Sequence, residues 1–142
     1  MEREKPISVL LVDDDPLVLA ATARALKRYG MQATCANSPF GVSALIRKDA
    51  PDVVVLDYHM PGLDGAHLVR VLRSSPRTAD IPVVFYSGAC DDELISLAHT
   101  LGAHYASKGI NPRELADAIS AALARHPSHA HAHAHAPIAR AV

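Results

Sequence analysis

The sequence predicts an α/β fold, a doubly wound five-stranded parallel sheet with five helices. Two observations carry this prediction. Short, dense aliphatic runs recur along the chain, and the stretches between them place their apolar residues at helical spacing. Strict alternation of strand and helix requires right-handed crossovers and a parallel sheet that is covered on both faces.

The strands are predicted from runs that lack the polar alternation of a half-exposed sheet. Three of them are almost continuously β-branched or aliphatic, which is typical of strands buried on both faces. Two more stand where strands should fall, with weaker patterns. The five predicted strands are Ile7–Val12, Met31–Ala36, Val53–Leu56, Ile81–Tyr86 and Ala103–Ala106.

The first two helices begin at prolines. Pro16 opens the first, because the first helical position tolerates a missing N–H. Ser38, followed by Pro39, is predicted to cap the second. The apolar stripes expected to face the core are Leu19, Ala23 and Leu26 in the first helix and Val42, Leu45 and Ile46 in the second.

The other three helices begin with polar residues. Asp64 is predicted to cap the third, and Asp91, Asp92 and Glu93 put negative charge in the first turn of the fourth. The segment 111–114, Asn-Pro-Arg-Glu, resembles a capping box for the fifth. The inward stripes expected here are Leu68, Val71 and Leu72 in the third helix and Leu115, Ile119 and Ala122 in the fifth.

Residues 1–125 are predicted to form one domain, followed by a tail over 126–142. The tail contains an alternating histidine–alanine repeat from His129 to His135, and its low complexity predicts disorder. The alternative left open is that these histidines bind Zn²⁺, Ni²⁺ or Cu²⁺. The other histidines show no ligand spacing and are expected at the surface; they are His59, His67, His99 and His104.

The composition of the chain disfavours nucleic acid and membranes as its partners. The 142 residues have a formal net charge of −1, which offers no basic footprint for nucleic acid and no polybasic patch for a membrane. No apolar run approaches the ~20 residues that a membrane span needs, and no signal-peptide cleavage site follows the charged N-terminus. We therefore expect a cytoplasmic protein with a protein or small-molecule partner.

Carboxylates follow two of the predicted strands. Asp13 and Asp14 come directly after the first strand, and Asp57 ends the third. If the strand order is 2-1-3-4-5, these three side chains converge where the winding direction reverses, which is where ligands bind in such sheets. Clustered carboxylates resist joint ionisation unless a cation neutralises them, and an all-oxygen ligand set suits Mg²⁺. Asp15 is expected to be a solvated turn residue.

Two further polar residues fall at the same edge of the sheet. Ser87 ends the fourth strand and Lys108 follows the fifth. A carboxylate nucleophile, a metal ion, a hydroxyl and an ammonium are what phosphoryl transfer to an aspartate requires.

Four separated motifs fall at the ends of four different predicted strands: Leu11–Pro16, Val54–Gly65, Pro82–Gly88 and Lys108. In their order and spacing, the chain resembles the response-regulator receiver family of two-component signalling. The resemblance runs from about Ile7 to Leu123 and implies the flavodoxin-like receiver fold with strand order 2-1-3-4-5.

The resemblance implies a role for each residue of the acidic site. Asp57 would accept a phosphoryl group from a phosphohistidine on a sensor histidine kinase or phosphotransfer protein. Asp13 and Asp14 would hold Mg²⁺, Asp14 most directly, together with Asp57 and the backbone carbonyl of His59.

The resemblance also implies how the signal leaves the site. Lys108 would pair with the phosphoryl oxygens, Ser87 would hydrogen-bond them, and Tyr105 would be the aromatic switch whose ring turns inward when Ser87 moves. The output protein would then bind the face made by the fourth helix, fifth strand and fifth helix, and a phosphorylation-dependent dimer is a further expectation. Gly109 stands where the family usually has a proline in a cis peptide, so a trans bond is expected here.

The leading hypothesis is a single-domain response regulator that signals by protein contact. It would not be an enzyme, apart from self-phosphorylation from small donors and autodephosphorylation. Two alternatives stay open: a pseudo-receiver that is an unphosphorylated interaction module, and a receiver fragment of a larger hybrid kinase or regulator. A phosphatase of the haloacid-dehalogenase type is disfavoured, because His59 stands where that chemistry needs an acid.

Overall fold

A computed structural model describes residues 5–59, 65–88, 91–109 and 111–125 of the chain. Its five-stranded parallel sheet has the order β2-β1-β3-β4-β5, which confirms the predicted fold class and strand order. In chain order the elements are β1 (Ile7–Val12), α1 (Pro16–Lys27), β2 (Met31–Ala36), α2 (Val42–Asp49), β3 (Val53–Asp57), α3 (Gly65–Arg73), β4 (Val83–Ser87), α4 (Asp92–Thr100), β5 (His104–Ser107) and α5 (Arg113–Arg125).

The strand boundaries agree with the predicted ones to within two residues. β1 and β2 match fully, whereas β3, β4 and β5 each end one residue later than predicted. β4 begins after Pro82, which has no N–H to donate to a neighbouring strand. The later ends matter for the site, because they place Asp57 and Ser87 on the last residues of β3 and β4.

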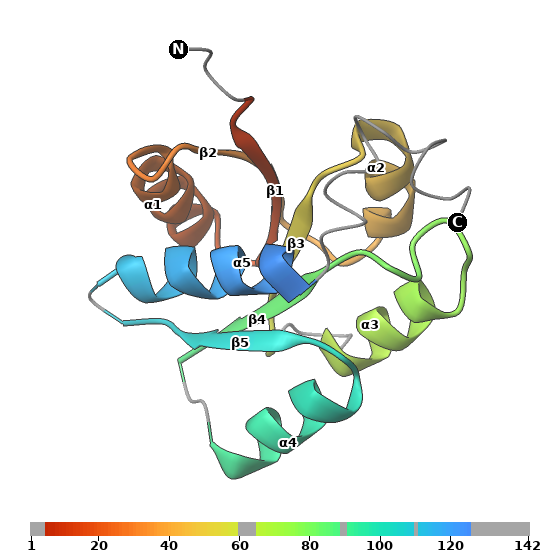
Figure 1. The fold of residues 1–142 in the computed structure, drawn as a ribbon. Coiled ribbons are helices and arrows are strands. Elements are labelled where there is room, and N and C mark those ends of the chain that lie inside the picture. The colour runs from red at the N-terminus through yellow and green to blue at the C-terminus, as the bar shows by residue number, and fades with distance from the viewer. Residues whose placement is uncertain (1–4, 60–64, 89–90, 110, 126–142) are drawn as a thin grey trace.

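Helices cover both faces of the sheet. Figure 1 shows α1 and α5 on one side and α2, α3 and α4 on the other. Alternate residues of β1 point to the two faces, so Val9 and Leu11 pack with α1 and α5 while Leu10 and Val12 pack on the opposite side. Phe85 of β4 is fully buried in this second cluster and is the largest such side chain among the described residues.

Aspartates cap two of the helices. Asp15 was expected to be a solvated turn residue, but it is the N-cap of α1, and its carboxylate accepts a hydrogen bond from the Leu17 N–H at 2.9 Å. Asp91 caps α4 in the same way through Leu94, so the predicted acidic first turn is confirmed. Each carboxylate satisfies an N–H that the helix leaves without a partner.

Two other predicted helix starts need correction. Ser38 does not cap α2, because that helix begins at Val42 after Gly41, whose φ of 83° is left-handed. The Ser38 hydroxyl instead accepts a hydrogen bond from the Phe40 N–H at 3.1 Å. At α5, the box predicted over 111–114 does not close: Asn111 accepts from the Arg113 N–H, while Glu114 turns to the Ser107 N–H.

The inward stripes are confirmed with one exception. Val71 is 42% exposed, and Val69 is buried in its place, because α3 presents residues at a spacing of three and four to the sheet. Leu115, Ile119 and Ala122 of α5 are fully buried, as predicted. Asp64 and the segment 126–142 lie outside the described residues. None of the described helices is long and apolar enough to cross a membrane.

The core allows a direct test of the fold. Replacing Phe85 with alanine should lower the free energy of unfolding by about 3–5 kcal/mol, because the truncation leaves a cavity between β4 and α3. Val71→Ala is the matched control and should change it by less than about 0.5 kcal/mol. Urea unfolding followed by circular dichroism measures both, and equal effects of the two variants would contradict the assigned packing.

Candidate functional site

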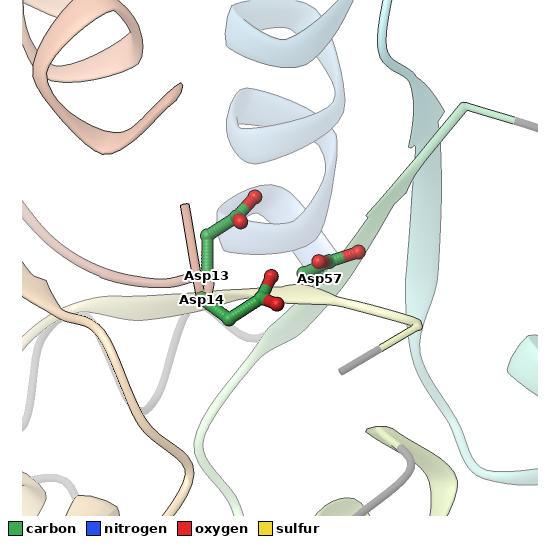
Figure 2. Close-up of side chains that lie close together, drawn as sticks. All are labelled: Asp13, Asp14 and Asp57. Carbon is green, nitrogen blue, oxygen red and sulfur yellow. The ribbon is translucent and has the colours of Figure 1, made fainter. Parts of the chain in front are cut away.

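Three carboxylates meet at the carboxyl ends of the two central strands. β1 and β3 are neighbours with Val12 opposite Leu56, so Asp13 and Asp14 emerge beside Asp57. Oxygen atoms from all three side chains lie within 4.8 Å of one another, and Figure 2 shows them gathered at this edge. Asp13 and Asp57 are only 5% and 7% exposed, whereas Asp14 is exposed.

Local hydrogen bonds from backbone N–H groups orient two of these carboxylates. Asp13 Oδ1 accepts a hydrogen bond from the Asp15 N–H at 2.9 Å, and Asp57 Oδ1 accepts one from the His59 N–H at 3.2 Å. Each bond spans two residues, as is usual for an aspartate in a turn. The turns that leave β1 and β3 therefore fix the side chains that lie on them.

Lys108 brings a positive charge into the cluster. Its Nζ lies 2.7 Å from Asp13 Oδ2 and 3.4 Å from Asp57 Oδ1. Its backbone N–H donates to the Ser87 carbonyl at 2.7 Å, which ties the loop after β5 to the end of β4. No cis peptide occurs among the described residues, so the expected trans bond before Gly109 is confirmed, and Lys108 still reaches the acids.

The charges of the cluster do not balance. Burial raises the pKa of Asp57, and the neighbouring Asp13 raises it further, although Lys108 and the His59 N–H act in the opposite direction. Burial alone would lower the pKa of Lys108, but its contacts with Asp13 and Asp57 outweigh burial and raise that pKa. One ammonium facing three carboxylates leaves net negative charge in a half-buried site.

This donor set fits a hard divalent cation. Among the described residues, the cluster consists of carboxylates, with no thiol or imidazole ligand atom. Mg²⁺ binds such oxygens through one or two carboxylates and keeps several water molecules, which suits a site with one exposed and two buried acids. Asp13, Asp14 and Asp57 are therefore the residues that could hold it.

Ser87 and His59 border the cluster. Ser87 is 1% exposed at the end of β4, opposite Ser107, the residue before Lys108. His59 follows Asp57 by two residues and is exposed. The roles assigned to the Ser87 hydroxyl and the His59 carbonyl remain predictions.

Tyr105 lies apart from the acids. It lies in β5, opposite Phe85 of β4, so β4 separates it from β3 and Asp57. Its side chain is 41% exposed. It lines a groove between α4 and α5 and belongs to the edge of the sheet. Its role as a switch also remains a prediction.

One residue near the site escaped the sequence analysis. The Tyr86 ring centre lies 5.8 Å from Lys108 Nζ, and Tyr86 lines a small cavity of about 10 Å³ together with Asp13 and Asp57. Burial raises the pKa of its hydroxyl, although the charge of Lys108 opposes this. A tyrosine, with its polar hydroxyl, at the end of an apolar strand and directly before Ser87 was the signal that could have found it.

Comparison with known proteins identifies the family. Residues 9–120 match the response regulator receiver domain. The chain belongs to this family. It is 32% identical over 117 residues to the protein PilH of Pseudomonas aeruginosa, covering 82% of this chain and 97% of PilH. It is also similar to a solved putative response regulator from Chloroflexus aurantiacus, with a TM-score of 0.77, 30% identity, and coverage of 85% and 100% of the two chains.

Other relatives are longer. The chain is 37% identical over 120 residues to the transcriptional regulatory protein CseB of Streptomyces coelicolor, covering 82% of this chain but 49% of CseB. The chain thus spans about half the length of several curated relatives that it matches. Receiver domains are signalling switches that bind Mg²⁺ at an acidic pocket and interact with histidine kinases and output partners.

The Lys108 contacts generate a prediction about metal affinity. Lys108→Ala should bind Mg²⁺ about 3- to 10-fold more tightly, because a positive charge a few ångströms away opposes the metal by on the order of 1 kcal/mol even in water. Isothermal titration calorimetry measures the change. Lys48→Ala, an exposed lysine of α2, is the control and should leave the affinity unchanged. Weaker Mg²⁺ binding by Lys108→Ala would contradict the expectation that the ammonium of Lys108 and the metal ion compete for the same carboxylates.

Proposed function

We propose that this chain is a single-domain response regulator that accepts a phosphoryl group on Asp57 in the presence of Mg²⁺. The observation that carries the proposal is the convergence of Asp57 with two other carboxylates and with Lys108 at one edge of the sheet. A nucleophile, a cation site and a fixed positive charge are then within reach of one incoming phosphoryl group.

The proposed reaction needs Asp57 as a carboxylate nucleophile. A carboxylate oxygen of Asp57 attacks phosphorus, the bond from phosphorus to the donor's imidazole nitrogen breaks, and the imidazole leaves with the bonding electron pair and takes up a proton. Although burial raises its pKa, Asp57 has Lys108 and the His59 N–H beside it, and both favour the ionised form.

The charge that arrives must be neutralised. The transferred group spreads negative charge over its oxygens, and positioned cations stabilise it. Lys108 Nζ lies 3.4 Å from Asp57 Oδ1 and is the fixed cation of the site. Mg²⁺, held by Asp13, Asp14, Asp57 and the His59 carbonyl, would supply further neutralisation of the phosphoryl oxygens.

The proposed output runs through β4 and β5. Ser87 would hydrogen-bond the phosphoryl group, and Tyr105 would move from its exposed position as Ser87 shifts. The surface changed in this way is the face of α4, β5 and α5, where an output protein or a second copy of the chain would bind. The proposed donor is a sensor histidine kinase or phosphotransfer protein in the cytoplasm, and residues 1–125 are proposed to form the whole receiver domain.

Intact-mass spectrometry after incubation with acetyl phosphate and Mg²⁺ tests the proposal. The chain should gain the mass of one phosphoryl group. Asp57→Asn should gain none, because the side-chain amide is a far weaker nucleophile than the carboxylate. Chelation of the metal by EDTA should also prevent the gain.

Asp92→Asn is the matched control, since Asp92 is an exposed acid in the first turn of α4. It should be phosphorylated as the unaltered chain is. A chain that gains no phosphoryl group from acetyl phosphate or from any phosphohistidine donor would be an interaction module instead, and the proposal would fail.

A further inference from the structure

Tyr86 and Lys108 meet on the face of the sheet that α1 and α5 cover. In β4, Val84 and Tyr86 point toward these helices, as Ala106 does in the neighbouring β5. Side chains alternate between the two faces along a strand, so Lys108, two residues after Ala106, returns to the same face. Its ammonium lies over the Tyr86 ring, with Nζ 5.8 Å from the ring centre.

A backbone hydrogen bond fixes the start of the loop after β5. The Lys108 N–H donates to the Ser87 carbonyl at 2.7 Å. Gly109 follows, and a residue without a Cβ has more conformational freedom than any other. In the described part of the chain, nothing beyond its sequence neighbours lies within 4 Å of the place that a Gly109 Cβ would occupy. The position of the Lys108 ammonium therefore depends on its side-chain contacts.

An open groove lies beside the Lys108 side chain. Its volume is about 340 Å³, and short side chains of α1 leave it wide. The residues that matter here are Ala21, Thr22 and Ala25 of α1, together with Tyr86, Lys108 and Gly109. A lysine stem is flexible and its ammonium is strongly hydrated, so the groove offers the ammonium a second position away from the acids. Holding the ammonium in one position also costs side-chain entropy.

Tyr86 borders both the groove and the acids. It lines the groove together with Lys108, and it lines the small cavity to which Asp13 and Asp57 also contribute. The face of an aromatic ring carries partial negative charge and attracts a cation within about 6 Å of its centre. The ring therefore stabilises the ammonium in the position where it also contacts the two carboxylates.

We propose that Tyr86 is a positioning residue for Lys108, and that its ring holds the ammonium against Asp13 and Asp57. The role needs the aromatic face, because an aliphatic side chain of similar size has no charge distribution that attracts a cation. The consequence for a phosphoryl group on Asp57 rests on the proposed function, whereas the placement of the ammonium does not.

Loss of the ring should change two affinities in opposite directions. In Tyr86→Leu the ammonium competes less well with Mg²⁺ for the carboxylates, so Mg²⁺ should bind about two- to threefold more tightly. Beryllofluoride, which mimics a phosphoryl group, should bind about two- to fivefold more weakly at saturating Mg²⁺, because its charge is met by a less well placed ammonium. A substitution that merely loosened the site would weaken both.

Isothermal titration calorimetry of the full chain measures the Mg²⁺ affinity, and a ¹⁹F NMR titration measures that of beryllofluoride. Tyr86→Phe keeps the ring and should match the unaltered chain in both. Tyr29→Leu, the same substitution at an exposed tyrosine between α1 and β2, is the matched control and should change neither.

A double-mutant cycle shows whether the ring acts through the ammonium. In the Lys108→Ala background, Tyr86→Leu should have no further effect on the Mg²⁺ affinity, because the partner of the ring is already absent. An equal effect of Tyr86→Leu with and without the lysine would overturn the proposal.

Proton NMR locates the ammonium without any ligand. An aromatic ring shields protons that lie over its face, so the ε-methylene signal of Lys108 should lie upfield of that of the exposed Lys48. The upfield shift should persist in Tyr86→Phe and disappear in Tyr86→Leu. An unshifted Lys108 signal in the unaltered chain, or Mg²⁺ and beryllofluoride affinities that fall together in Tyr86→Leu, would overturn the proposal. Absence of beryllofluoride binding in the unaltered chain contradicts the proposed function instead, and the proton shift and the Mg²⁺ cycle then decide the role of Tyr86.

Discussion

The charge arrangement around Lys108 is the interaction on which the site depends. A single ammonium lies 2.7 Å from Asp13 and 3.4 Å from Asp57, both of which are almost buried. Burying two carboxylates side by side is costly unless cations neutralise them. Lys108 meets part of that need, and the remaining negative charge creates the demand for a divalent ion. In the proposed function, the same residue would meet a phosphoryl group carried by Asp57.

The parallel sheet makes this arrangement possible. Because all the strands run in one direction, β1, β3, β4 and β5 end at one edge, and residues up to 95 positions apart in the chain touch there. The edge at the other end of β5 has a different chemistry, with alanines and histidines around a groove. Tyr105 of β5 lines this groove and lies three residues before Lys108 of the acidic site.

Much of this could be predicted from the sequence, because periodicity and strand-end position are local signals. The strand runs, the burial of α5 and the meeting of Asp13, Asp14 and Asp57 follow from them. The failures depend on contacts that the sequence does not display. Val71 and Val69 compete for the same stripe, and only packing of α3 on the sheet decides between them. Asp15 is a helix cap because its turn faces the first N–H groups of α1. His99 and His104 needed the α4–β5 turn to bring them into one groove.

The most direct test of the central claim is ¹⁹F NMR of the full chain with beryllofluoride, a tetrahedral mimic of the phosphoryl group. With Mg²⁺ present, bound fluorine signals should appear in the unaltered chain and be absent from Asp57→Asn and from a sample treated with EDTA. Bound signals that persist in Asp57→Asn, or that form without a divalent cation, would contradict the account, because the mimic would then be held by something other than the carboxylates and Lys108.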